Sequence, residues 1–439
     1  MNTLDDVLAI NGEFEILLPD QSVKAIGHLE LKERIVLSAL VYKQPFSNII
    51  PSTEFRVCGN IGGTEVTLLD CLISADLTPI KNADYCTFSI VPSEIIVGKC
   101  YTGDILISEI ISIVPDLNYM GLRRPDDQFF ANKHESLTNQ RPSRIEACDS
   151  DGKISIFRKC SQLIYQDRVE FKYNPILSFS FNQPHKLFEA KCKVLSARNL
   201  LTFFADHYIA ITCFRFTDAS DLEASKKDGT AHLYKHLYNN YQHNIDVNDR
   251  AFLLRIYAYA DNFQSIWLKW QEFYRENSSI YTLFYEIICN RSTYVNCFLN
   301  LTQALEIYSS YYRKSEVKLI AKKMNNTNGK VKITLRNRIE DILLYTSTIL
   351  SIDSSQCGIL AKYVSDVRNY YTHYKKKNYK PTINAILAAN NLLRYILLII
   401  VFKHVGIPDK FIAECKQLLQ YSRLKHDVAF LLSECEKAK

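Results

Sequence analysis

The chain has 439 residues, more than a single domain usually contains, so its length predicts two or three domains. Of these residues, 47% are hydrophobic and 12% aromatic, a composition that excludes a disordered or fibrous protein. The formal net charge of +6 is mildly basic, and by itself it does not indicate a nucleic-acid-binding protein.

Cysteine usage and hydropathy indicate where the protein works. The 13 cysteines are scattered and form no C-x-x-C pair, so the sequence favours reduced thiols over a disulfide framework or a zinc ribbon. The acidic first residues are unlike a secretory signal. The most apolar stretch, 395–402, is far shorter than the roughly 20 residues of a membrane-spanning helix. We therefore expect a cytoplasmic protein without a membrane segment.

The first half of the chain is rich in β-forming residues. Turns such as those at 62–63 and 151–152 separate these runs, as in antiparallel sheets. A helix over 187–206 and an apolar strand over 208–216 follow. We predict an N-terminal β-rich domain over residues 1–217, sandwich-like or barrel-like, with a regulatory or sensor role. The predicted strands lie at 14–18, 28–42, 65–69, 86–91 and 154–158.

The second half is predicted to be helical. Residues 218–249 are polar and indicate a linker or a long surface loop. Residues 250–439 form a helical region, and the core of its bundle covers about residues 294–404. The predicted fold class is therefore α+β multidomain, a β-rich domain followed by an all-α bundle. The predicted helices lie at 250–276, 280–289, 294–313, 334–350, 356–377, 382–404 and 410–436.

One motif in the helical half carries chemistry. Arg368 and His373 enclose four residues, and the polar Asn369 directly follows the arginine. The spacing alone is not decisive, because 20 arginines and 10 histidines in 439 residues give about 0.5 such pairs by chance. The context adds weight, since the motif lies on a late helix of the bundle and a strongly apolar helix follows it.

This arrangement resembles the nuclease members of the HEPN superfamily, whose motif is an arginine, a polar residue, three variable residues and a histidine. The likeness rests on Arg368, Asn369 and His373 within residues 294–404. With a β-rich first half that includes Gly-Glu-Phe at 12–14 and Ile-Gly-His-Leu at 26–29, the chain is similar to the ApeA-like antiphage proteins. The resemblance implies a HEPN bundle and abortive-infection defence by RNA cleavage, with no metal ion and no cofactor.

The residue types suit cleavage of RNA by its own 2′-hydroxyl. Histidine titrates near neutral pH, so His373 is expected to transfer a proton. The planar, permanently charged guanidinium of Arg368 is expected to bind phosphate oxygens in the transition state. Asn369 stands four residues before His373 on the same helical face and is expected to orient the imidazole. The expected products carry a 2′,3′-cyclic phosphate and a 5′-hydroxyl.

Helix geometry separates the two principal catalytic candidates. Five positions at about 100° each place Arg368 and His373 roughly 140° apart around the helix axis. A two-fold dimer that faces motif against motif would join them, and the HEPN resemblance implies such a homodimer. Glu306, on the helix that opens the bundle, is a candidate supporting acid for Arg368 or His373.

Basic and aromatic residues near the motif are candidate RNA contacts. Charge runs at helix ends also serve solubility, and tyrosines more often pack than stack on bases, so both interpretations stay open. A second cluster holds eight basic residues between Lys314 and Arg338. The candidates at the motif are Lys375, Lys376, Lys377, Lys380 and Tyr374, with Tyr370 and Tyr371 as further stacking residues.

Other chemistries find less support in the sequence. His232, His236 and His243 would suit a metal site if two of them shared a helical face, but no acidic or cysteine ligand completes the set. No G-x-S-x-G elbow, P-loop or Rossmann fingerprint occurs.

The expected partners follow from the resemblance. They are RNA of host or phage origin, with tRNA as one candidate, and a phage-derived activator sensed by the N-terminal domain. Two alternatives stay open: a non-catalytic HEPN-like module that binds nucleotides or proteins, and a HEPN toxin silenced by a cognate antitoxin.

Overall fold

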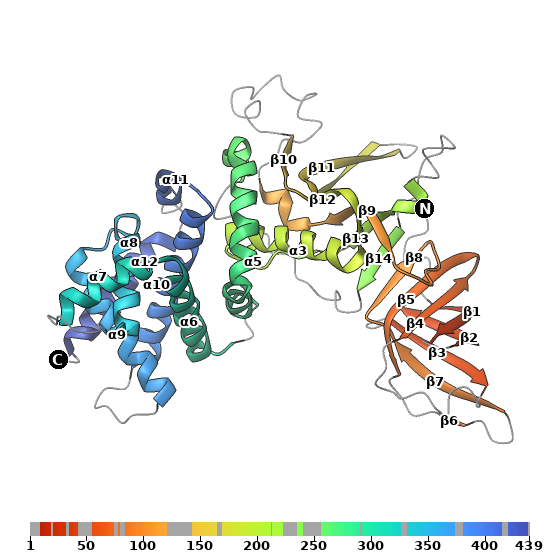
Figure 1. The fold of residues 1–439 in the computed structure, drawn as a ribbon, viewed down its shortest axis with the longest axis horizontal. Helices are drawn as coiled ribbons and strands as arrows, with labels where there is room; N and C mark the ends of the chain where they lie inside the picture. The colour runs from red at the N-terminus through yellow and green to blue at the C-terminus, as the bar shows by residue number, and fades with distance from the viewer. Residues whose placement is uncertain are drawn as a thin grey trace. The chain divides into compact units, whose positions relative to one another are not determined.

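The computed structural model of the chain contains two compact units (Figure 1). The first consists of Met1–Asn118, Leu122–Leu195 and Ala210–Asp249, and the second of Tyr119–Gly121, Ser196–Ile209 and Arg250–Lys439. The residues described are 9–18, 21–31, 35–42, 55–73, 78–79, 84–120, 143–164, 169–211, 213–222, 235–239, 256–289, 292–325, 332–373, 381–414 and 420–437.

Six antiparallel strands of the first unit close into a barrel. They run in the order β5-β4-β1-β2-β3-β7, and β7 pairs back with β5 to complete the ring. The expected strand over 28–42 is divided between two of them, which pair with each other as a hairpin. The bounds are β1 (Ala9–Leu17), β2 (Ser22–Leu31), β3 (Ile35–Tyr42), β4 (Phe55–Ile61), β5 (Thr64–Ile73) and β7 (Tyr85–Val91), with the short β6 (Thr78–Pro79) paired to β7.

Alternation of apolar residues fills the barrel interior. Every second side chain of β3 points inward, which is the period expected of a strand with one buried face. Phe14 needs glycines on both neighbouring strands: a Cβ at Gly59 would lie 2.3 Å from its ring, and one at Gly27 would lie 3.3 Å from it. The inward residues of β3 are Ile35, Leu37, Ala39 and Val41, each at most 2% exposed.

A second run of antiparallel strands continues from the barrel. It starts where β8 pairs with β5 and proceeds in the order β8-β14-β13-β9-β12-β11-β10. β14 lies within residues 218–249, so the expected linker contributes a strand instead; its Leu237 is 1% exposed. The bounds are β8 (Glu94–Val97), β9 (Leu106–Ile113), β10 (Arg144–Cys148), β11 (Gly152–Ile164), β12 (Val169–Lys186), β13 (Cys213–Asp218) and β14 (Lys235–Asn239), with the 3-10 helix η2 (Pro115–Met120) after β9.

Helix α3 (Leu187–Ala205) is divided between the two units. In the first unit, Lys191 forms an ion pair with Glu94 of β8. In the second, the ring of Phe203 stacks on Phe284 with centroids 4.3 Å apart. An N-terminal domain over residues 1–217 would have kept this helix whole, whereas residues 196–209 group with the C-terminal helices because their aromatic side chains are buried there.

The rest of the second unit is helical. The predicted helix at 250–276 corresponds to the 3-10 helix η4 and the first part of α5, and the predicted helix at 280–289 to the second part of α5. Between the two parts the backbone of Asn277 leaves helical geometry, so the predicted interruption is a kink, where the buried Asn277 amide donates to the carbonyl oxygen of Phe273 (3.4 Å) and to the Tyr312 hydroxyl (2.5 Å). The bounds are η4 (Ile256–Asn262), α5 (Phe263–Ile288), α6 (Tyr294–Tyr312), α7 (Lys314–Asn325), α8 (Leu335–Leu350), α9 (Ser354–His373), α10 (Ile383–His404), α11 (Asp409–Glu414) and α12 (Gln420–Lys437).

Helix α10 forms the apolar centre of the bundle and packs against α6 and α12. It is the one helix among the described residues that is long and apolar enough to cross a membrane, but core helices also meet that test, and most of α10 is buried. It ends where Gly406 adopts a φ of +89° and the Ile407 N–H donates to the Phe402 carbonyl (2.9 Å). A β-rich first part and an all-α second part confirm the predicted fold class.

Candidate functional site

The Arg368–His373 motif occupies the end of α9. Buried residues such as Leu360, Val364 and Val367 fix this helix in the bundle, where it packs mainly against α8 and also against α6 and α12. The helix continues without a break to His373. The motif residues therefore keep the angular spacing of an α-helix.

Arg368 and His373 lie on different sides of α9. Arg368 follows the buried Val364 by four positions and is half-buried, whereas His373 is exposed. In the described part of the chain, no hydrogen bond or ion pair joins the two side chains. One copy of the chain thus presents the two residues in different directions.

Asn369 lies on the same face as His373, four positions earlier, and is half-buried. Its expected role in orienting the imidazole stays a prediction. The hydroxyl of Thr372 donates to the backbone carbonyl oxygen of Arg368 at 2.9 Å, a bond within the helix that does not involve the guanidinium.

Glu306 does not meet the motif in this structure. It is half-buried on α6, and its carbonyl oxygen accepts a hydrogen bond from Ser310 Oγ at 2.7 Å. Ser310 Oγ in turn accepts one from Arg338 at 2.7 Å. Among the residues described, the Glu306 carboxylate forms no ion pair with Arg368 or His373, so a role as supporting acid finds no contact here.

An exposed apolar strip beside the motif was not foreseen from the sequence. Burial, together with Tyr294 and Tyr370, raises the pKa of Tyr371. Helix α6, which begins at Tyr294, packs against α9. Asn390 donates to the Tyr294 carbonyl at 2.8 Å, and Ile383 and Leu387 precede Asn390 on the same face of α10. Tyr294, Ile383 and Leu387 are 40%, 56% and 43% exposed among the residues that the structure describes. The spacing was visible in the sequence, but the exposure of this face was not.

The predicted RNA contacts can be placed only in part. Lys375, Lys376, Lys377, Lys380 and Tyr374 lie outside the described residues. Tyr370 packs edge-to-face on Tyr371, with centroids 5.0 Å apart, which favours packing for this pair. In the second basic cluster, the exposed lysines on α7 are Lys314, Lys318, Lys322 and Lys323.

The described residues contain no group of His, Cys, Asp and Glu side chains that could hold a metal ion. His236 lies on strand β14, where burial and Arg215 lower its pKa, so it does not form the helical H-x3-H pair considered above. His232 and His243 lie outside the described residues.

Two family models match the chain. A model described as Apea-like HEPN matches residues 299–411, which include α8, α9 and α10, and a model described as ApeA N-terminal domain 1 matches residues 9–270. No curated protein and no solved structure matches the chain. The HEPN match contains the whole Arg368–His373 motif, and the N-terminal match contains the barrel and helix α3.

Proposed function

Because this chain belongs to the ApeA family of HEPN-domain proteins, we propose that it is a metal-independent RNA endonuclease of antiphage defence. The family itself is one of HEPN nucleases linked to such defence. The observation that carries the proposal is the motif of Arg368, Asn369 and His373 at the end of α9, within the segment that matches the HEPN model.

In the proposed reaction, the ribose 2′-oxygen bonds to phosphorus while the bond from phosphorus to the 5′-oxygen breaks. His373 accepts the proton of the 2′-hydroxyl or gives one to the departing 5′-oxygen. Arg368 binds the non-bridging oxygens, where negative charge grows in the transition state. The products carry a 2′,3′-cyclic phosphate and a 5′-hydroxyl, and cleavage is expected to persist in EDTA.

A homodimer completes the site in this proposal. Arg368 and His373 point to different sides of one α9, so a two-fold partner would supply the arginine that faces each histidine. The exposed apolar strip of Tyr294, Ile383 and Leu387 supports this, since it offers a surface beside the motif for the second copy to bury.

The β-rich part serves as sensor in this scheme. A phage-derived activator would bind there, and the nuclease would then cut host or phage RNA, with tRNA as one candidate, in the cytoplasm. This assignment is supported by the joint presence of a β-rich N-terminal segment and a HEPN segment in one chain.

The test compares wild type with His373→Ala and with His426→Ala, a change at an exposed histidine on α12 of the same unit. Each protein is incubated in EDTA with cellular RNA and an extract of phage-infected cells as the source of activator, and RNA ends are mapped. Wild type and His426→Ala should give cyclic-phosphate ends, and His373→Ala should cleave at least about 100-fold more slowly. Cleavage that EDTA abolishes and divalent metal restores, or equal cleavage by His373→Ala, would contradict the proposal.

A further inference from the structure

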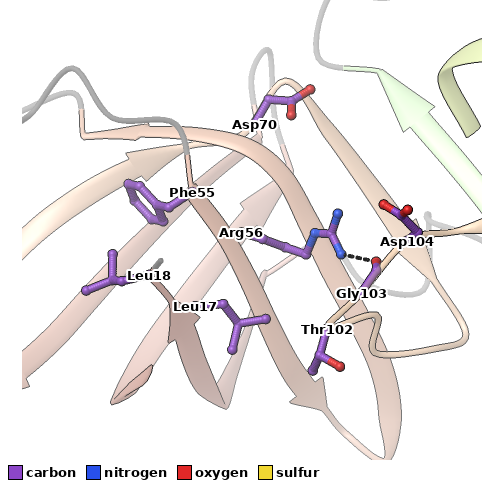
Figure 2. Close-up of a pocket in the computed structure, with 8 residues that line it drawn as sticks. All are labelled: Leu17, Leu18, Phe55, Arg56, Asp70, Thr102, Gly103 and Asp104. Carbon is purple, nitrogen blue, oxygen red and sulfur yellow. Dashed lines mark hydrogen bonds between the residues drawn. The ribbon is translucent and has the colours of Figure 1, made fainter. Parts of the chain in front are cut away.

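A cleft of about 480 Å³ opens at one end of the barrel (Figure 2). Its volume lies in the range of sites for small molecules or a few peptide residues. Figure 2 shows the Arg56 head group between Asp70 and Asp104, with the apolar side chains on the other side of it. The lining residues are Leu17, Leu18, Phe55, Arg56, Asp70, Thr102, Gly103 and Asp104.

Arg56 is held in place but not fully used. One terminal nitrogen, Nη1, donates to the carbonyl oxygens of Tyr101 (3.0 Å) and Gly103 (2.5 Å). Within the described residues, its Nε and Nη2 donate to no protein group and its guanidinium forms no ion pair. A guanidinium fixed at one end, with a fork of donors still available, suits a planar anion such as a carboxylate.

A β-bulge shapes the wall opposite Arg56. Phe55 pairs with Cys71 and Val57 pairs with Leu68, so Leu69 and Asp70 together face Arg56. Asp70 adopts a φ of +48°, which is uncommon for a residue with a side chain, and Ser93 Oγ donates to its carboxylate at 3.0 Å. The bulge thus holds a carboxylate at the rim of the cleft.

The charges around the cleft favour a singly charged anion over a doubly charged one. Lys186 pairs with Asp104 at 2.8 Å, and this hydrogen bond lowers the pKa of Asp104 and keeps it ionised. Among the lining residues that the structure describes, one cation, Arg56, and one anion, Asp70, remain. A doubly charged phosphate would be repelled by Asp70 more strongly than a singly charged carboxylate, and the amide N–H next to a peptide carboxylate could donate to Asp70.

We propose that this cleft binds the C-terminal carboxylate of a peptide whose last side chain is apolar. The carboxylate meets Arg56, and the apolar side chain rests on Leu17, Leu18 and Phe55, of which Phe55 is only 7% exposed. The idea that an activator docks in this cleft rests on the proposed function. The binding of a peptide C-terminus in the cleft does not.

Binding is measured by calorimetry on the full chain with acetyl-Ala-Ala-Leu as the free acid and as the C-terminal amide. The free acid should bind at least about 10-fold more tightly, as expected for loss of a charge-assisted hydrogen bond in the amide. Free leucine and inorganic phosphate are compared as other sources of an anion. Equal binding of acid and amide, tighter binding of phosphate, or no binding of the acid at millimolar concentration would overturn the proposal, and tightest binding by free leucine would reassign the cleft to an amino acid.

Three variants test the geometry. Arg56→Gln should weaken binding of the free acid about 10-fold, whereas Arg144→Gln, at an exposed arginine of β10, should not change it. Asp70→Asn removes the repelling charge, while the carbonyl oxygen of its side chain can still accept the peptide N–H; binding should therefore tighten severalfold, a gain that misfolding cannot imitate. Weaker or unchanged binding by Asp70→Asn would count against the site. RNA cleavage is not read in these assays, so failure of the cleft and failure of the nuclease proposal are distinguished.

Discussion

At the scale of single residues, the motif combines two side chains that lie on different sides of one helix. Val364 and Arg368 share one side of α9 with the bundle core, and His373 faces away from it. The five-residue spacing is therefore informative about assembly as well as chemistry. In the proposed dimer, a second copy of the chain would bring an arginine to each histidine.

Mixed dimers test this division of labour. Arg368→Ala and His373→Ala are each expected to be inactive, but unfolding and refolding them together should restore about a quarter of wild-type cleavage, because about half of the dimers then carry one complete site. Cleavage is measured on the RNA identified with wild type. Arg423→Ala mixed with His426→Ala, two exposed positions on α12, should keep full activity. If the mixture stays inactive while both variants still dimerise, the two residues do not act across the interface.

The placement of the motif on one helix could be predicted from sequence, whereas the roles of its residues stay a prediction. Arg368, Asn369 and His373 belong to one helix, so local spacing fixes their mutual orientation. Glu306 sits on another helix, and its distance from the motif depends on how α6 and α9 pack, which no spacing encodes. For the same reason the cleft at Arg56, built from four separate chain segments, left no recognisable pattern in the sequence.

At the scale of elements, periodicity predicted the helices well because their apolar faces are buried against neighbours. The exceptions have local causes. Residues 277–279, Asn-Ser-Ser, are poor helix formers and separate the two predicted helices; in the structure the backbone is non-helical at Asn277, so α5 is kinked at this point. β14 was not predicted because it lies in a mostly polar stretch of sequence; its Leu237 is buried.

The end of α10 makes stability depend on pH. Burial among aromatic rings lowers the pKa of His404; its ring lies 4.4 Å from Tyr312 and 4.9 Å from Phe273. Lys269 lowers this pKa further, whereas Glu272 and Glu276 oppose the effect. Below about pH 6.5, the unfolded chain therefore binds a proton at this histidine more readily than the folded chain does. The free energy of unfolding consequently decreases as the pH falls below 6.5.

This contribution can be isolated by urea unfolding between pH 5 and 8. Below about pH 6.5, wild type should lose up to about 1.4 kcal/mol per pH unit more than His404→Gln, the slope for one proton. The matched change His426→Gln, at an exposed histidine, should keep the wild-type slope. Parallel pH profiles for wild type and His404→Gln would show that this histidine does not control stability.

At the scale of the whole molecule, the division of α3 between the two units determines which truncated chains are expected to fold. Residues 196–209 supply Phe203 and Phe204, both fully buried, and Asp206, whose carboxylate accepts a hydrogen bond from Arg394 of α10 at 2.7 Å. Phe204 lies 5.8 Å from the ring of Phe402. The helical unit is incomplete without this segment.

Two truncated chains should therefore behave differently. Residues 187–439 should unfold cooperatively on heating, whereas residues 250–439 should aggregate or melt without a clear transition, since each lost phenylalanine contact removes about 1.5–3 kcal/mol from a marginal total. Thermal unfolding of both chains is followed by circular dichroism, and aggregation is followed by size-exclusion chromatography. A soluble 250–439 chain with the same melting temperature as 187–439 would show that residues 196–209 contribute little.

The division of α3 between the two units also bears on how the two family segments can recombine between relatives. The N-terminal family segment ends at residue 270, inside α5, and thus carries both α3 and the first part of a helix belonging to the helical unit. A hybrid that joined the first 249 residues of one relative to the remainder of another would set a foreign Phe203 against Phe284 and a foreign Asp206 against Arg394. The N-terminal and HEPN segments are therefore expected to be inherited as a matched pair, and recombination between relatives is expected to be disfavoured at residue 249.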